Sequence, residues 1–189
     1  MKKVVTFLVV IIGIGFLGGC SVKKTIELTD AERFANEYAI NTKNPFTYAT
    51  IGQVLDLLEN KSGIIFFGDS DCEWCVISAS ILSDVGMDQK LDTIYYYNPT
   101  KIKAQNTKKY RELVSILQKH LDLEAEEEFT LSLPEVYFVK NGKIVAHKDG
   151  TSITEIDSDR KTSKSKEKLK QEYLSLIKDY KKKECADNC

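Results

Sequence analysis

GIIFFGDSDCEWC, residues 63–75, is the stretch of sequence that predicts the fold. The β-branched and aromatic run 64–67 lies between two glycines, which is typical of a buried central strand. The polar residues 68–71 are typical of a turn, in which Ser70 or Asp71 could cap a helix. We therefore expect a strand that passes through a turn into a helix.

The helix after this turn should begin close to two cysteines. Apolar side chains recur there at helical spacing, and Gly86 is expected to end the helix: Val76, Ile77, Ile81, Leu82 and Val85. Cys72 and Cys75 fall at the predicted helix N-terminus, where backbone N–H groups and the helix dipole favour a thiolate. We expect Cys72, nearer the open end, to attack a disulfide. Cys75, one turn deeper, would resolve the mixed disulfide.

A second pattern follows further along the chain. Residues 133–139 and 143–147 are two apolar runs separated by Asn141-Gly142. An Asn-Gly pair between two such runs is a strong signal for a β-hairpin. Pro134 stands at the start of the first run, where the missing N–H is tolerated.

Together these patterns resemble the thioredoxin-like thiol–disulfide oxidoreductases, over roughly residues 51–150. More narrowly, the chain is similar to the membrane-anchored lipoprotein type of Gram-positive bacteria, including bacteriocin transport accessory proteins. The resemblance implies an α/β thioredoxin-like fold, with a central mixed sheet of about four strands flanked by helices. It also implies an N-terminal helical extension and a helical insert before a cis-proline.

The resemblance assigns roles to three residues besides the cysteines. It implies that Pro134 is cis and that Leu133 presents its backbone to a substrate chain, although a trans proline is the commoner form. Trp74, between the cysteines, is expected to form part of an apolar docking patch, the alternative being a plain surface aromatic. Phe66 stands where thioredoxin has a buried acid, so Glu73 or water would have to accept the proton of the resolving thiol.

The N-terminus predicts a membrane anchor. Residues 1–19 combine two lysines with a short apolar stretch and resemble a bacterial lipoprotein signal peptide. Cys20 would then be the lipidated N-terminal residue, and two acyl chains give stable anchoring. The alternative is an uncleaved N-terminal anchor. Either arrangement puts the domain on the extracytoplasmic face of the cell membrane, where disulfides persist.

Cysteine pairing is the next signal, because the chain has five cysteines. With Cys20 assigned to the lipid, the others form two close pairs, Cys72/Cys75 and Cys185/Cys189. We favour a structural disulfide for Cys185/Cys189. The alternative is a redox pair that exchanges electrons with Cys72/Cys75. A zinc site built from both pairs is a further alternative, although three residues separate the tail cysteines.

The remaining chain is divided by its periodicity and composition. We expect a tether at 20–29, a thioredoxin-like domain at 30–183 and a cysteine-containing tail at 184–189. The expected elements not yet named are helices at 30–40, 48–59, 103–121 and 168–182, a parallel strand at 91–98, an acidic loop at 123–129 and a linker at 151–166. His120 and His147 are expected to be a helix-end residue and a strand residue, and the sequence does not identify a partner for either.

The function predicted from these features is thiol–disulfide exchange on exported proteins or peptides. Asp69, Asp71 and Glu73 disfavour further negative charge, which favours a reductase or isomerase. No organic cofactor or metal is implied, and electrons would pass to or from an unidentified membrane partner. The net charge of −1 gives no support to nucleic-acid binding. The alternatives are a non-catalytic accessory protein that binds an exported peptide, such as a bacteriocin, and a disulfide-forming oxidase.

Overall fold

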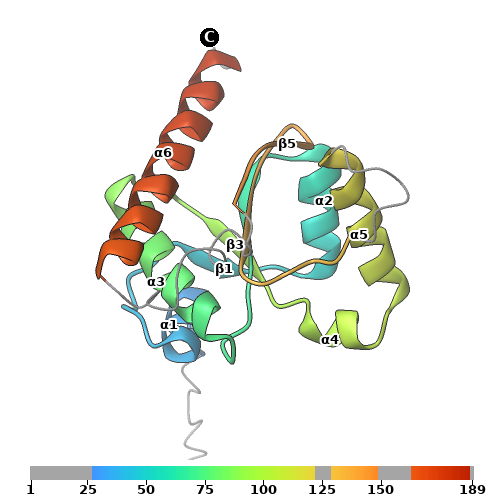
Figure 1. Ribbon diagram of the computed structural model, residues 1–189, viewed down its shortest axis with the longest axis horizontal. Coiled ribbons are helices and arrows are strands. Elements are labelled where there is room, and N and C mark those ends of the chain that lie inside the picture. The colour runs from blue at the N-terminus through green and yellow to red at the C-terminus, as the bar shows by residue number, and fades with distance from the viewer. Residues whose placement is uncertain (1–26, 122–128, 149–162, 188–189) are drawn as a thin grey trace, which may run out of the picture.

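The computed structural model describes residues 27–121, 129–148 and 163–187 (Figure 1). Their elements are α1 (Asp30–Tyr38), β1 (Phe46–Tyr48), α2 (Ile51–Asn60), β2 (Gly63–Phe67), α3 (Glu73–Asp88), β3 (Ile94–Tyr97), α4 (Thr100–Ala104), α5 (Lys108–His120), β4 (Glu135–Lys140), β5 (Lys143–Lys148) and α6 (Ser163–Asp187). The predicted signal peptide, Cys20 and Cys189 lie outside the described residues. Among the described helices, none is both long and apolar enough to span a membrane.

One mixed sheet joins all five strands, in the order β1-β3-β2-β4-β5. β1, β3 and β2 run parallel to one another, whereas β4 is antiparallel to both β2 and β5. This is the α/β thioredoxin-like fold, so the predicted fold class is confirmed. The expected number of strands was too low, because β1 was predicted as part of a loop and a helix start. Its three residues are too few for a periodic pattern, and they are held by pairing with β3, in which Phe46 lies opposite Ile94.

Helices cover both faces of the sheet (Figure 1). Successive side chains of a strand point to opposite faces, so β2 divides its residues between two apolar clusters. Ile64 and Phe66 pack in the cluster that includes α1, α3 and α6. Ile65 and Phe67 pack in the cluster that includes α2 and α5. The central strand is therefore buried on both sides, as its apolar run predicted.

Several helix ends differ from the expected ones. The N-cap of α3 is Cys72 and not Ser70 or Asp71. The same helix continues through Gly86 to Asp88. Gly86 faces Pro45 so closely that an added Cβ would lie 3.1 Å from the proline ring. Here the missing side chain permits a close approach and does not end the helix.

The two later helices also start or break at unexpected places. The single helix expected at 103–121 is divided into α4 and α5, since Asn106 has a left-handed backbone with a φ of 43°. α6 begins at Ser163, inside the expected linker, and continues beyond its expected end. Charged residues obscure the start of its apolar pattern.

The turn of the β4–β5 hairpin docks on the end of α2. The Gly142 N–H donates to the Lys61 carbonyl over 2.9 Å, and the Asn141 N–H donates to Ser62 Oγ over 3.0 Å. Gly142 has a φ of 70°, and a Cβ at this position would lie 2.1 Å from the Glu59 carbonyl oxygen. Both the backbone conformation and the close approach therefore require glycine.

We expect Gly142→Ala to lower the free energy of unfolding by about 1 to 3 kcal/mol, since it adds a strained left-handed residue and a steric clash. Urea unfolding followed by circular dichroism measures this change. Gly52→Ala is the matched control, because a Cβ there meets only Thr50 Oγ1 at 3.9 Å. In α2 that substitution should be neutral or stabilise by up to about 1 kcal/mol. Equal effects of the two substitutions would contradict this account.

Candidate active site

The loop between β2 and α3 is organised by Asp69. Its carboxylate accepts hydrogen bonds from Thr100 Oγ1 over 2.6 Å and from the Asp71 N–H over 3.1 Å. Its backbone carbonyl accepts a hydrogen bond from the Cys72 N–H over 3.0 Å. The Thr100 hydroxyl holds the pKa of Asp69 below its usual range, and partial burial opposes this shift. Asp69 therefore fixes the loop that leads into Cys72, through both its carboxylate and its backbone carbonyl.

Cys72 occupies the N-cap position of α3, with its sulfur turned toward the free N–H groups of the first turn. The Cys75 N–H donates to Cys72 Sγ over 3.3 Å. A hydrogen bond of this kind stabilises negative charge on the acceptor atom. Cys72 is half-buried, and both cysteines are free thiols in the structure. The cap position thus gives Cys72 the access and the hydrogen-bond donor that a nucleophile needs.

Cys75 lies one turn further along α3 in a different environment. Its side chain is fully buried, in the apolar cluster that also holds Phe66. Burial raises the pKa of the Cys75 thiol well above its ordinary value, and the hydrogen bond with Cys72 acts in the same direction. The negative charge of Asp69 also raises it. The two thiols therefore differ in access and in their surroundings.

The proline segment faces the half-buried thiol of Cys72. The Leu133–Pro134 peptide bond is cis, which is the isomer that the resemblance implied. The Leu133 carbonyl oxygen lies 4.0 Å from Cys72 Sγ, and Pro134 is buried behind it. The structure thus brings together four of the predicted site residues from distant parts of the sequence. Trp74, the fifth, is half-buried in the first turn of α3.

Sequence reasoning missed a buried carboxylate next to this segment. Glu135, directly after Pro134, is only 3% exposed and lies 3.2 Å from His147 Nε2. His147 lies in β5, as expected, and Glu135 is the partner that the sequence did not identify; the His147 ring also stacks on Tyr137. The available signal was Glu135 itself, an acidic residue at the start of an apolar strand. Its partner His147 lies on β5 and becomes adjacent only when β4 and β5 pair.

The other predicted positions do not join this site in the described residues. Cys185 lies in the last turns of α6. The structure describes the backbone of these turns but not their side chains. The tail disulfide and the zinc alternative that share Cys189 stay predictions. Among the described side chains, no group of three His, Cys, Asp or Glu residues is arranged to hold a metal ion.

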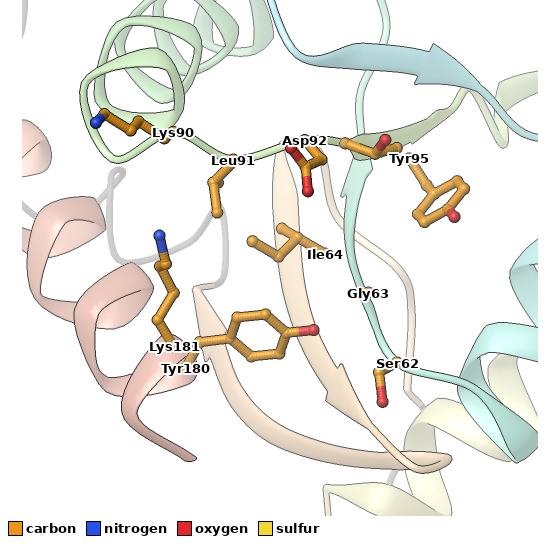
Figure 2. A pocket seen from close by; sticks show the side chains of 10 residues that line it. Ser62, Gly63, Ile64, Lys90, Leu91, Asp92, Tyr95, Tyr180 and Lys181 are labelled. Atoms are coloured by element: carbon orange, nitrogen blue, oxygen red, sulfur yellow. The ribbon is translucent and has the colours of Figure 1, made fainter. Parts of the chain in front are cut away.

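A separate cavity of about 340 Å³ opens at the other end of β2 (Figure 2). Gly63 starts the strand there, whereas the cysteines follow its opposite end at Phe67. Lys90 and Lys181 stand on one side of the cavity, and the Tyr180 ring points toward it. Lys181 Nζ donates to the Gln89 carbonyl over 2.9 Å, which ties α6 to the end of α3. No cysteine lines this cavity, so it is distinct from the thiol site.

No family model and no curated protein matches the sequence. Among the solved structures that match is a chain described as a proposed oxidoreductase with a thioredoxin fold. It shares 15% identity, and the match covers 56% of this chain and 82% of that chain with a TM-score of 0.38. The fold assignment therefore depends on the strand order and pairing directions given above.

Cysteine modification should distinguish the two thiols. At neutral pH we expect iodoacetamide to modify Cys72 first, because Cys75 is buried and its raised pKa keeps it protonated. In a Cys72→Ser variant, modification of Cys75 should become appreciable only above the pH range of an ordinary thiol. Mass spectrometry of peptides taken over time measures both rates. The same variant unfolded in urea is the control, and equally fast modification in the folded protein would contradict the assignment.

Proposed function

We propose that this protein is an extracytoplasmic thiol–disulfide oxidoreductase that acts on exported proteins or peptides through Cys72 and Cys75. The observation that supports this most directly is the placement of Cys72, half-buried at a helix N-cap and 4.0 Å from the Leu133 carbonyl oxygen. An attacking thiol needs access and a hydrogen-bond donor beside its sulfur, and Cys72 has both. The buried Cys75, one turn away, suits the resolving role.

In the reducing direction the reaction has two steps. The Cys72 thiolate attacks a substrate disulfide, which forms a bond to Cys72 Sγ, breaks the substrate S–S bond and releases one substrate thiolate. Cys75 then passes its proton to Glu73 or to water and attacks Cys72 Sγ, which forms the Cys72–Cys75 disulfide and releases the second substrate thiolate. The substrate gains two electrons and the protein loses two. A dithiol-bearing membrane partner would return the protein to its reduced form.

The direction of electron flow is proposed from the charges at the site. Strong oxidants stabilise their reduced form through a favoured thiolate. Here Asp69, Asp71 and Glu73 precede or follow Cys72 and oppose further negative charge. This favours a reductase or isomerase over an oxidase.

The cellular location is part of the same proposal. It follows from the lipoprotein-like residues 1–19 and from Cys20, which would carry the lipid anchor. A tethered domain outside the membrane would meet exported chains in an environment where disulfides persist. Cys185 and Cys189 would then form a structural disulfide in the tail.

Redox titration tests the proposed activity. The protein from residue 21 onward, with Cys185→Ser and Cys189→Ser, is equilibrated in thiol redox buffers while the fluorescence of Trp74 is followed. We expect a reversible transition with a midpoint near that of thioredoxin, about −270 mV. A midpoint near about −120 mV would identify an oxidase and contradict the charge argument. With no reversible transition, the enzymatic proposal fails and a non-catalytic binding protein remains. A Cys72→Ser variant is the control for the fluorescence signal.

Trp74→Ala tests the proposed docking patch. We expect the reduction of a disulfide-linked peptide to slow by roughly tenfold, because a half-buried aromatic contact is worth about 1 kcal/mol or more. Reduction of bis(2-hydroxyethyl) disulfide, which offers little surface, should change by less than about twofold. Because Trp74 is the only tryptophan in the chain, fluorescence cannot follow this variant, and the released thiols are measured chemically. Unchanged rates on the peptide would refute the docking role.

A further inference from the structure

Two charged side chains bind one peptide unit beside the active site. Lys103 Nζ, from α4, donates to the Leu131 carbonyl over 2.8 Å. Glu135 Oε1, from β4, accepts from the Ser132 N–H over 2.9 Å. This carbonyl and this N–H belong to the same peptide group, and in a trans peptide they point in opposite directions. The Leu131–Ser132 peptide is thus held from both sides by opposite charges, an arrangement called here the peptide clamp.

The clamp is anchored deeply on the Glu135 side. A buried carboxylate is costly unless hydrogen bonds replace its lost hydration. Glu135 meets this requirement, since its second oxygen accepts from the Tyr137 hydroxyl and lies 3.2 Å from His147 Nε2. These contacts tie the segment before Pro134 to both strands of the hairpin. Ser132 is therefore held by a carboxylate whose own position is fixed by two further groups, the Tyr137 hydroxyl and the His147 ring.

We infer that Lys103 and Glu135 are positioning residues that hold the Leu133 backbone against Cys72 for a polypeptide substrate. The clamped peptide is followed directly by Leu133, whose carbonyl oxygen lies 4.0 Å from Cys72 Sγ. A shift of the clamp moves this carbonyl, which is the group expected to face the substrate chain. The inference rests on the proposed function, and it specifies the substrate class as extended polypeptide.

Neither residue acts on the thiols directly. Glu135 shares its sheet face with Tyr137, which packs in the cluster of α2 and α5. Cys75 packs in the other cluster, across the sheet. Removing the clamp should therefore leave the chemistry of the thiols intact and affect only substrates that pair with the Leu133 backbone. This separates a positioning role from a catalytic one.

Two disulfide substrates test the clamp with the full chain. One is a disulfide-linked peptide, which can pair with the backbone, and the other is bis(2-hydroxyethyl) disulfide, which has no peptide group. In Glu135→Ala and Lys103→Met we expect the rate constant for the peptide to fall by about tenfold, the usual effect of losing a hydrogen bond to a charged group. The rate constant for the small disulfide should stay within about twofold of the wild type, since the thiols are unchanged.

Matched variants separate the clamp from general effects of charge. Lys101→Met removes an exposed lysine from the same helix and should leave both rates unchanged. Glu135→Gln keeps an oxygen that can accept from the Ser132 N–H, so it should recover part of the lost rate. If Glu135→Ala does not fold, as judged by its thermal unfolding, Lys103→Met alone decides the question, because that side chain is only partly buried.

The outcomes are distinguishable from those for the proposed function. If the wild type reduces both disulfides and Lys103→Met slows only the peptide, the inference is supported. If the folded variants reduce both substrates as fast as the wild type, or lose both rates equally, the clamp is not a positioning device. If the wild type reduces neither substrate, the proposed function fails and the inference fails with it.

Discussion

Burial of β2 on both faces is the constraint on which the rest of this structure depends. A strand covered by helices on each side has no exposed face for a polar side chain, so its apolar run continues without a break. Polar chemistry can begin only where the strand ends, at Phe67. The turn organised by Asp69 follows immediately and leads into the helix that Cys72 caps. The buried strand thereby determines where the thiols lie.

The electrostatics of the site divide into two parts. Close to the thiols, apolar burial governs Cys75, and Phe66 occupies the position at which the thioredoxin resemblance implied an acid. Among the residues that the structure describes, the buried carboxylate is Glu135, which lies across the sheet and binds a backbone amide. Charge is therefore used to hold the polypeptide segment that faces Cys72, while Cys75 is surrounded mainly by apolar side chains.

Local sequence signals predicted the features that depend on neighbouring residues. The apolar run before the cysteines, the helical spacing after them and the Asn-Gly turn each have a local physical cause, and each leads to an observed element. Features that arise from distant contacts were missed. β1 is held by pairing with β3, Gly86 lies within α3 and packs closely against Pro45, and Glu135 meets His147 only through the hairpin. Cys72 was overlooked as a cap because oxygen-bearing side chains are the usual cap residues.

The peptide clamp has a consequence for how such chains diverge. Lys103 and Glu135 contact the same peptide group from opposite directions, although Lys103 lies 28 positions from Leu131 in the sequence and Glu135 only three from Ser132. If Glu135 is lost, Lys103 still binds the Leu131 carbonyl but nothing binds the Ser132 N–H. If Lys103 is lost, the buried Glu135 binds the Ser132 N–H and the Leu131 carbonyl loses its donor. Selection would therefore tend to change the two positions together. Covariation of positions 103 and 135 among related sequences would then show which of them keep the clamp and, under the proposed function, its preference for polypeptide substrates. The cysteine motif alone does not carry this information.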